Sequence, residues 1–142
     1  MEYIKIRLGN VLEQKMRRSG DTEDTMFHHT FNPMFSFSER LWKPHMDIFE
    51  TPEDIIILAE IAGVDSRNIE IEVCDRAVRI SGKRAESPPV PNATYRLAEI
   101  QNGSFERILK LPRAIDTERV TAEYANGFLK IHLKKTNHPQ SV

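Results

Sequence analysis

The chain has little of what membrane, secreted and nucleic-acid-binding proteins need. Its one cysteine, Cys74, excludes an internal disulfide and leaves no cysteine-based zinc site. The 20 Lys and Arg residues almost balance the 21 Asp and Glu residues, so no overall positive charge attracts nucleic acid. No segment reaches the roughly 20 apolar residues of a membrane span, and residues 1–20 lack the apolar core of a signal peptide. We therefore expect a cytoplasmic protein without stable membrane insertion and without a nucleic-acid partner.

Motifs for catalysis, cofactor binding and metal binding are also missing. The sequence contains no Gly-x-Ser-x-Gly, no His-Glu-x-x-His and no phosphate-binding loop. Cys74 lies two positions after Glu72 and directly before Asp75. Such acidic neighbours disfavour a reactive thiolate, so a structural role is the better interpretation. His28 and His29 are adjacent, without a carboxylate or cysteine at ligand spacing. We expect no catalytic residue, no cofactor and no metal site, and hence no enzyme.

Three unlike parts follow one another along the chain. Residues 1–43 form an N-terminal arm rich in Phe and Met, which we expect to be partly helical or disordered. Residues 44–135 have the pattern of a folded domain, and residues 136–142 form a short polar tail. The helix prediction rests on apolar residues at helical spacing near the start of the arm: Ile4, Leu8, Val11, Leu12 and Met16.

Short strands are predicted throughout residues 44–135. Apolar and polar residues alternate over 69–73, 120–124 and 129–134, which places apolar side chains on one face of each strand. Asn126 and Gly127 form the dipeptide favoured in two-residue hairpin turns. The prolines within 86–92 predict a loop. About seven or eight such strands, separated by turns, predict an antiparallel β-sandwich.

Four segments of this region carry a resemblance to a known family. Residues 122–131 fit the pattern Ala-x-x-x-Asn-Gly-apolar-Leu-x-Ile, and residues 99–112 fit Glu-x-x-x-Gly-x-Phe-x-Arg-x-x-x-Leu-Pro. Residues 46–52 resemble the family's opening strand. Residues 61–64 resemble its Leu-Pro-Gly turn, with Ala62 in place of the proline. Together, these segments resemble the α-crystallin domain of small heat-shock proteins of the bacterial and plant type.

This resemblance implies a fold, an activity and a mode of dimerisation. The fold is an immunoglobulin-like antiparallel β-sandwich. The activity is that of an ATP-independent chaperone, a holdase, which binds partly unfolded proteins and prevents their aggregation. The homodimer forms by strand exchange, in which the long loop between Arg84 and Gly103 gives a short strand to the edge strand 46–50 of the partner. The alternative is a loop that covers its own chain. The exchange residues would be Tyr95, Arg96, Leu97, Ala98 and Glu99 on the donated strand, with Met46 and Ile48 on the acceptor.

The resemblance also implies an apolar groove between the strands 69–73 and 120–124. In the family this groove accepts an Ile-x-Ile/Val tail motif from a neighbouring subunit. The alternative is that the lining residues are ordinary core residues. The tail 136–142 contains no such motif, so any oligomer larger than a dimer must depend on the N-terminal arm. The candidate lining residues are Ile71, Val73, Val120 and Ala122.

Client binding is expected in the segment from Met26 to Phe37. Phenylalanine offers a large apolar contact area, and methionine adapts its shape to varied partners. The alternative is that these side chains pack on the sandwich or inside an oligomer, and both roles are compatible. The candidate client-binding residues are Phe27, Phe31, Met34, Phe35 and Phe37.

One other class of function fits a domain of this kind. A co-chaperone or adaptor of the CS-domain type binds a specific folded partner rather than unfolding clients. That fold lacks the long loop expected between Arg84 and Gly103, and the Asn-Gly signature of residues 122–131 disfavours it.

Overall fold

The described regular structure of the chain is almost entirely β. The computed structural model describes residues 2–8, 13–19, 41–85 and 90–137. Within these ranges lie nine strands and one short 3-10 helix, η1 (Ser66–Asn68). The strands are β1 (Glu2–Leu8), β2 (Glu13–Ser19), β3 (Met46–Glu50), β4 (Asp54–Glu60), β5 (Ile69–Cys74), β6 (Ala77–Arg84), β7 (Gly103–Lys110), β8 (Ile115–Ala125) and β9 (Phe128–Lys135).

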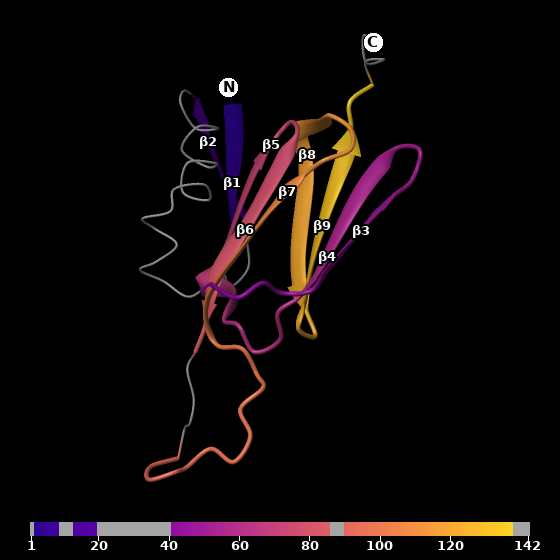
Figure 1. Ribbon diagram of the computed structural model, residues 1–142. Coiled ribbons are helices and arrows are strands. Elements are labelled where there is room, and N and C mark those ends of the chain that lie inside the picture. Colours follow the sequence, from indigo (N-terminus) through magenta and orange to yellow (C-terminus); the bar gives the residue numbers. More distant parts are fainter. Residues whose placement is uncertain (1, 9–12, 20–40, 86–89, 138–142) are drawn as a thin grey trace.

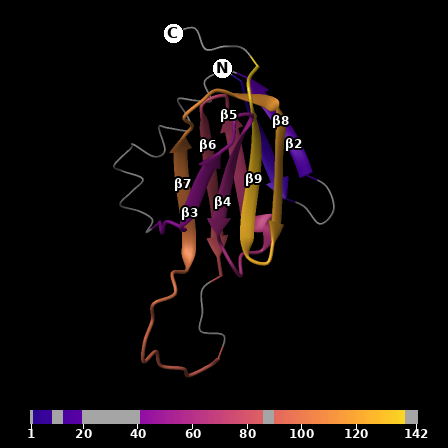
Figure 2. The same cartoon turned by 90° about the vertical axis from the view of Figure 1, so that its right-hand side faces the viewer.

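The strands form two sheets that pack face to face (Figure 1). Sheet A has the order β2-β1-β5-β6-β7, and sheet B has the order β3-β4-β9-β8. Every pairing of named strands is antiparallel. The turned view in Figure 2 shows the strands of sheet B in front of those of sheet A. The predicted immunoglobulin-like antiparallel β-sandwich is therefore confirmed.

Alternation along the strands builds the core between the sheets. On β4, Ile55, Ile57 and Ala59 are fully buried, whereas the residues between them are only half-buried. In a strand, successive side chains point to opposite faces, so one apolar face per strand is enough to form the core. The largest fully buried side chains are Phe105, Ile6, Ile55, Ile57, Ile61, Ile69, Ile71, Ile80, Ile115, Leu129, Ile131 and Leu133.

The hairpin between β8 and β9 has the two-residue turn that its Asn-Gly dipeptide predicts. Asn126 and Gly127 both have positive φ, 55° and 84°, as the Asn-Gly pattern predicted. The carbonyl oxygen of Gly127 accepts a hydrogen bond from the Ile61 amide at 2.9 Å. A Cβ on Gly127 would lie 2.9 Å from the Cβ of Ala62, so this close approach also requires glycine. The hairpin is thereby fixed against the end of β4.

The predicted N-terminal helix is wrong for the described part of the arm. Residues 2–8 and 13–19 form the antiparallel hairpin of β1 and β2, which belongs to sheet A. The helical spacing ignored Ile6, which with Ile4 and Leu8 gives an apolar residue at every second position. Isoleucine favours strands, and β5 offers a sheet edge to which β1 hydrogen-bonds. Tertiary pairing therefore overrides a weak helical pattern.

Candidate client-binding and assembly surfaces

The residues predicted to line a groove lie under β1. Ile71 and Val73 on β5, and Val120 and Ala122 on β8, are all buried and belong to the common core. β1 pairs with β5 so that Ile6 lies opposite Ile71 and Ile4 opposite Val73. It also contacts β8 on the other sheet. The structure brings the four predicted residues together, and a strand of the same chain covers them.

The inward face of β1 is apolar and buried. Ile4, Ile6 and Leu8 all belong to the core cluster, and Ile6 has no exposed surface. Full burial of such a side chain stabilises a fold by roughly 1.5–3 kcal/mol relative to an exposed position. These contacts hold β1 on the sandwich.

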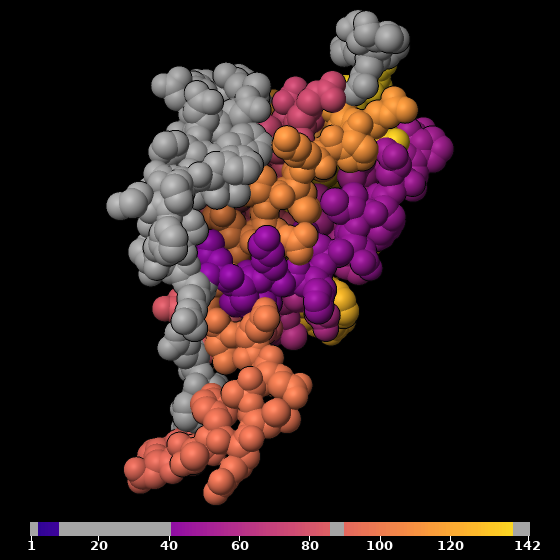
Figure 3. All heavy atoms as spheres, in the orientation of Figure 1, coloured from indigo at the N-terminus to yellow at the C-terminus, as the bar shows by residue number. Residues whose placement is uncertain are grey.

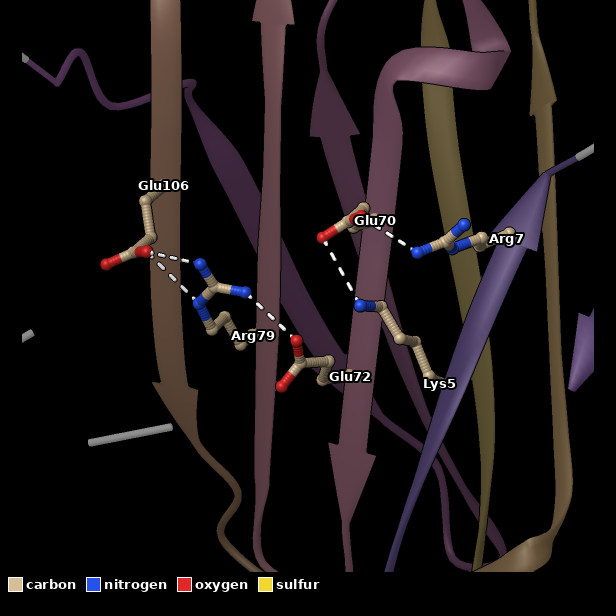
Figure 4. Close-up of polar contacts among 6 residues, drawn as sticks. All are labelled: Lys5, Arg7, Glu70, Glu72, Arg79 and Glu106. Atoms are coloured by element: carbon tan, nitrogen blue, oxygen red, sulfur yellow. Dashed lines mark hydrogen bonds and ion pairs between the residues drawn. The ribbon is translucent and has the colours of Figure 1, made fainter. Parts of the chain in front are cut away.

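The outward face of β1 is basic and meets an acidic residue of β5. Lys5 Nζ lies 3.6 Å from Glu70 Oε2, and Arg7 Nη2 lies 3.5 Å from Glu70 Oε1 (Figure 4). Because the shared Glu70 carboxylate is exposed to water, each pair is worth at most about 1 kcal/mol. They align the strand, while the apolar face supplies most of its stabilisation.

A second charge cluster crosses the outer face of sheet A. Arg79 on β6 lies between Glu72 on β5 and Glu106 on β7, with nitrogen to oxygen distances of 3.1 and 2.8 Å (Figure 4). The three side chains are mostly buried, so water screens these pairs less than those of β1. The cluster joins the outer faces of three neighbouring strands.

Arg84 anchors the base of the long loop between β6 and β7. Its guanidinium donates hydrogen bonds to the carbonyl oxygens of Gln101 and Ala62, the latter at 3.1 Å. The same group lies 4.2 Å from the ring centroid of Trp42. Trp42 Nε1 in turn donates to the Gly103 carbonyl at 3.0 Å. These contacts fix both ends of the loop on the sandwich, and the sequence interpretation missed them.

Beyond this base the loop carries exposed apolar side chains. Residues 90–102 extend away from the body of the sandwich (Figures 1 and 3). Leu97 is 74% exposed and Ile100 is 77% exposed, and Tyr95 and Val90 are exposed as well. Tyr95 to Glu99, the predicted donated strand, have no strand structure within the single chain. Within the described residues, this segment has no neighbouring strand with which to form a ladder.

The predicted acceptor strand is an exposed sheet edge. β3 pairs only with β4, so its other side is open in the described structure. Met46 packs against the core, whereas Ile48 is 41% exposed and Phe49 is 46% exposed. Phe49 and Ile100 were not among the predicted assembly residues. The apolar character of both positions was visible in the sequence, but their exposure was not.

The predicted client-binding residues lie outside the described residues. These are Phe27, Phe31, Met34, Phe35 and Phe37. They stay predictions from the sequence.

Carboxylates at two places have lowered pKa values. Hydrogen bonds from the side chain and then the backbone of Arg67 lower the pKa of Asp65 to about 2, and Asp65 thereby caps η1 just before β5. The Lys134 ammonium, 2.7 Å from Asp54 Oδ1, lowers the pKa of Asp54, and His132 at 3.3 Å acts in the same direction. Both carboxylates therefore stay charged in mildly acidic solution.

The described residues form no arrangement typical of a catalytic or metal site. Cys74 is buried at the end of β5. No group of three or more His, Cys, Asp or Glu side chains in the described ranges is placed to hold a metal ion. His28 and His29 lie outside those ranges. Among the described helical residues, no helix is long and apolar enough to cross a membrane.

Comparisons with known proteins agree with this architecture. The model of the Hsp20/alpha crystallin family matches residues 47–142. Small heat shock protein C4 of Rickettsia felis is 31% identical over 118 residues, which cover 79% of this chain and 72% of that protein. The structure of heat shock protein 16.0 from Schizosaccharomyces pombe has a TM-score of 0.62 and 25% identity, covering 71% of this chain and 94% of that one. A small heat-shock protein from Xylella fastidiosa has a TM-score of 0.60 and 28% identity, with 71% and 94% covered.

Proposed function

Because the chain belongs to the Hsp20/alpha crystallin family of small heat-shock proteins, we propose that it is an ATP-independent chaperone. It binds partly unfolded proteins and keeps them from aggregating. The observation that carries this proposal is the family match over residues 47–142 together with a sandwich that exposes apolar side chains on its long loop and on its β3 edge. This activity needs no bound nucleotide and no catalytic residue, because binding alone shields the exposed apolar surface of an unfolding client from other clients.

Client binding is assigned to the aromatic segment of the N-terminal arm. It contains Phe27, Phe31, Phe35 and Phe37 within 11 positions, with Met34 among them. Aromatic rings bury much area per side chain, and a mixed Phe and Met surface suits partners without a fixed shape. The sandwich would then act as a rigid carrier for this segment.

Homodimerisation by strand exchange is the second part of the proposal. β3 is an edge strand with exposed Ile48, and an edge of this kind is a ready template for another strand. The loop offers such a strand, since Tyr95 and Leu97 are two positions apart and both exposed. Exchange between two copies would cover the apolar side chains on both elements and pair the open edge.

Larger assemblies are assigned to the N-terminal arm rather than to the tail. Residues 136–142 contain no Ile-x-Ile/Val motif of the kind that links dimers in the resembling family. The related protein from Xylella fastidiosa is described as having a distinct high order structure, which concerns that protein alone. For this chain we propose a dimer as the basic unit, in the cytoplasm, with unfolding proteins as its partners.

Light scattering from an aggregating client tests the activity. A heat-labile enzyme is heated with the chain, without nucleotide, and the chain should suppress scattering at a near-equimolar ratio. No suppression, combined with tight binding to one folded partner, would instead favour the CS-domain type of adaptor. Turnover of a substrate would favour an enzyme.

A matched pair of variants tests the assigned segment. Replacing its four phenylalanines with serine should abolish suppression, because the apolar contact area is lost. Replacing four polar residues of the same segment with alanine should leave suppression intact, and equal activity in both variants would refute the assignment. The polar control positions are His28, Thr30, Asn32 and Ser36.

A further inference from the structure

The long loop joins β7 close to the place where β3 of the same chain begins. Trp42 forms a parallel bridge with Phe105 near the start of β7, and β3 starts soon afterwards in the sequence, at Met46. Between these two points, the Pro44 carbonyl accepts a hydrogen bond from Arg107 of β7 at 2.8 Å. The open edge of β3 therefore begins beside the base of the loop.

The segment 95–99 consequently has two acceptor edges to choose from, β3 of its own chain and β3 of a second copy. Only residues 100–102 separate this segment from β7, and three extended residues span about 10 Å. A short flexible tether gives an acceptor on the same chain an effective concentration in the millimolar range, provided that the tether can reach it. With a free loop base, pairing within one chain would compete with pairing between chains.

The guanidinium of Arg84 restrains the loop directly after this segment. It donates two hydrogen bonds to the Gln101 carbonyl, one of them from Nε at 2.9 Å. It also donates from Nη1 to the Ala62 carbonyl at 3.1 Å. Arg84 ends β6 in sheet A, whereas Ala62 follows β4 of sheet B, so one planar group ties the loop to both sheets. The fixed fork of a guanidinium holds several acceptors at defined angles, which a single ammonium group does not do.

Trp42 and Gly103 fix the direction in which the loop leaves β7. Trp42 Nε1 donates to the Gly103 carbonyl at 3.0 Å, and the Arg84 guanidinium lies 4.2 Å from the centroid of the same ring. Gly103 has a φ of 88°, which only glycine adopts readily, so the chain changes direction here. Residues 90–102 then extend away from the sandwich, whereas β3 runs along it towards the opposite end (Figure 1). The loop base thus points the segment 95–99 away from its own β3.

We propose that Arg84 and Trp42 are positioning residues that direct the segment 95–99 to β3 of a second copy instead of β3 of its own chain. This inference rests on the proposed strand exchange and names the residues that make the exchange occur between chains. The two side chains act from the loop base and need no contact with the partner. A base that is already held in the exchanging orientation loses less freedom on dimerisation, which strengthens the dimer.

Cross-linking with a flexible bifunctional maleimide tests the direction of pairing. Leu97→Cys on the loop and Ile48→Cys on β3 are combined on a Cys74→Ala background, so that the two introduced thiols alone react. With Arg84 in place, the links should form between chains and give a dimer band on denaturing electrophoresis. Adding Arg84→Gln should lower the ratio of links between chains to links within one chain by about tenfold or more, because the freed loop then reaches its own β3. A variant that only loosened the fold would not convert one kind of link into the other.

Lys83→Gln is the matched control, because it removes the same charge from the exposed neighbouring position on β6 and should leave the ratio unchanged. Arg84→Lys keeps a positive charge but lacks the fork, so it should shift the ratio in the same direction as Arg84→Gln. It also carries the test if the glutamine variant does not fold. An unchanged ratio in the folded Arg84 variants would overturn the proposal while leaving the exchange intact. If no link between chains forms even with Arg84 present, the strand exchange itself is wrong, and the proposal is wrong with it.

Discussion

Gly82 shows how one small residue holds the base of the long loop in place. It lies on β6, opposite Phe105 in the register. A Cβ at this position would lie 2.3 Å from the Asn68 carbonyl oxygen and 2.6 Å from Phe105 Cζ. The Phe105 ring packs against Trp42 at a centroid distance of 5.2 Å, and Trp42 in turn contacts Arg84. The absence of a side chain at Gly82 therefore makes room for the cluster that anchors the loop.

Replacing Gly82 with alanine should lower the free energy of unfolding by about 1–3 kcal/mol, because the methyl group overfills a packed site. Urea unfolding followed by the fluorescence of Trp42, the chain's one tryptophan, measures this. The neighbouring Ser81→Ala variant should change stability by less than about 0.5 kcal/mol. Equal stabilities of the two variants would contradict this account, because the packing around Gly82 would then accommodate a methyl group without loss of stability.

Asp65 makes stability depend on pH through its cap on η1. Its pKa in the folded chain is about 2, whereas an unfolded chain has the ordinary value of about 3.9. Since the folded pKa is lower, the stabilisation is present above pH 4 and disappears as the pH falls toward 2. Arg67→Gln removes the main cause and should raise the pKa of Asp65 toward its ordinary value.

Nuclear magnetic resonance titration of the Asp65 carboxyl measures this shift directly. The control is Arg113→Gln, which alters an exposed arginine on the turn between β7 and β8. It should leave the pKa of Asp65 at about 2. An unchanged pKa in Arg67→Gln would show that the cap does not depend on this side chain.

At the level of elements, the alternation of apolar and polar residues was sufficient to predict most strands of the sandwich. The predictions for residues 69–73 and 120–124 are confirmed because one apolar face per strand is a local property. The N-terminal helix was wrong because Ile4, Leu8 and Met16 fit a helix, whereas β5 offers a strand partner that no local pattern reveals. The contacts at the loop base could not be predicted either, since they join residues far apart in the sequence.

The predictions for the groove and for the strand exchange concern contacts with other segments or with a second copy, which a local pattern does not determine. The residues of β5 and β8 that were predicted to line a groove belong to the common core, and only the structure places β1 beside them. The segment proposed as the donated strand has no strand partner among the described residues, so its proposed pairing with a second copy cannot be derived from one chain.

The proposed strand exchange predicts a specific loss of dimer. Leu97→Asp places a charge on a side chain that is exposed in the single chain but covered in the exchanged one, so the chain should fold normally and dimerise weakly. Native mass spectrometry measures the ratio of monomer to dimer. Thr94→Asp adds the same charge just outside the predicted strand and should leave the dimer intact. Equal dimer fractions in the two variants, or a monomeric unmodified chain, would rule out this exchange.

The described part of the molecule combines a packed sandwich with apolar side chains that the sandwich does not cover. The core between the sheets is buried, whereas the long loop and the β3 edge each expose apolar side chains. Assembly and client binding are assigned to different segments, so they should respond to different substitutions. The near-zero net charge favours apolar contact over long-range attraction as the basis of the proposed client binding.

Recovery of a soluble complex tests the proposed holding activity most directly. The chain and a heat-labile enzyme are heated together without nucleotide, centrifuged, and separated by size-exclusion chromatography. We predict that the enzyme stays in the supernatant and elutes with the chain in a complex larger than either protein alone. If the enzyme sediments while the chain elutes unchanged at its own position, the chain does not hold unfolding proteins.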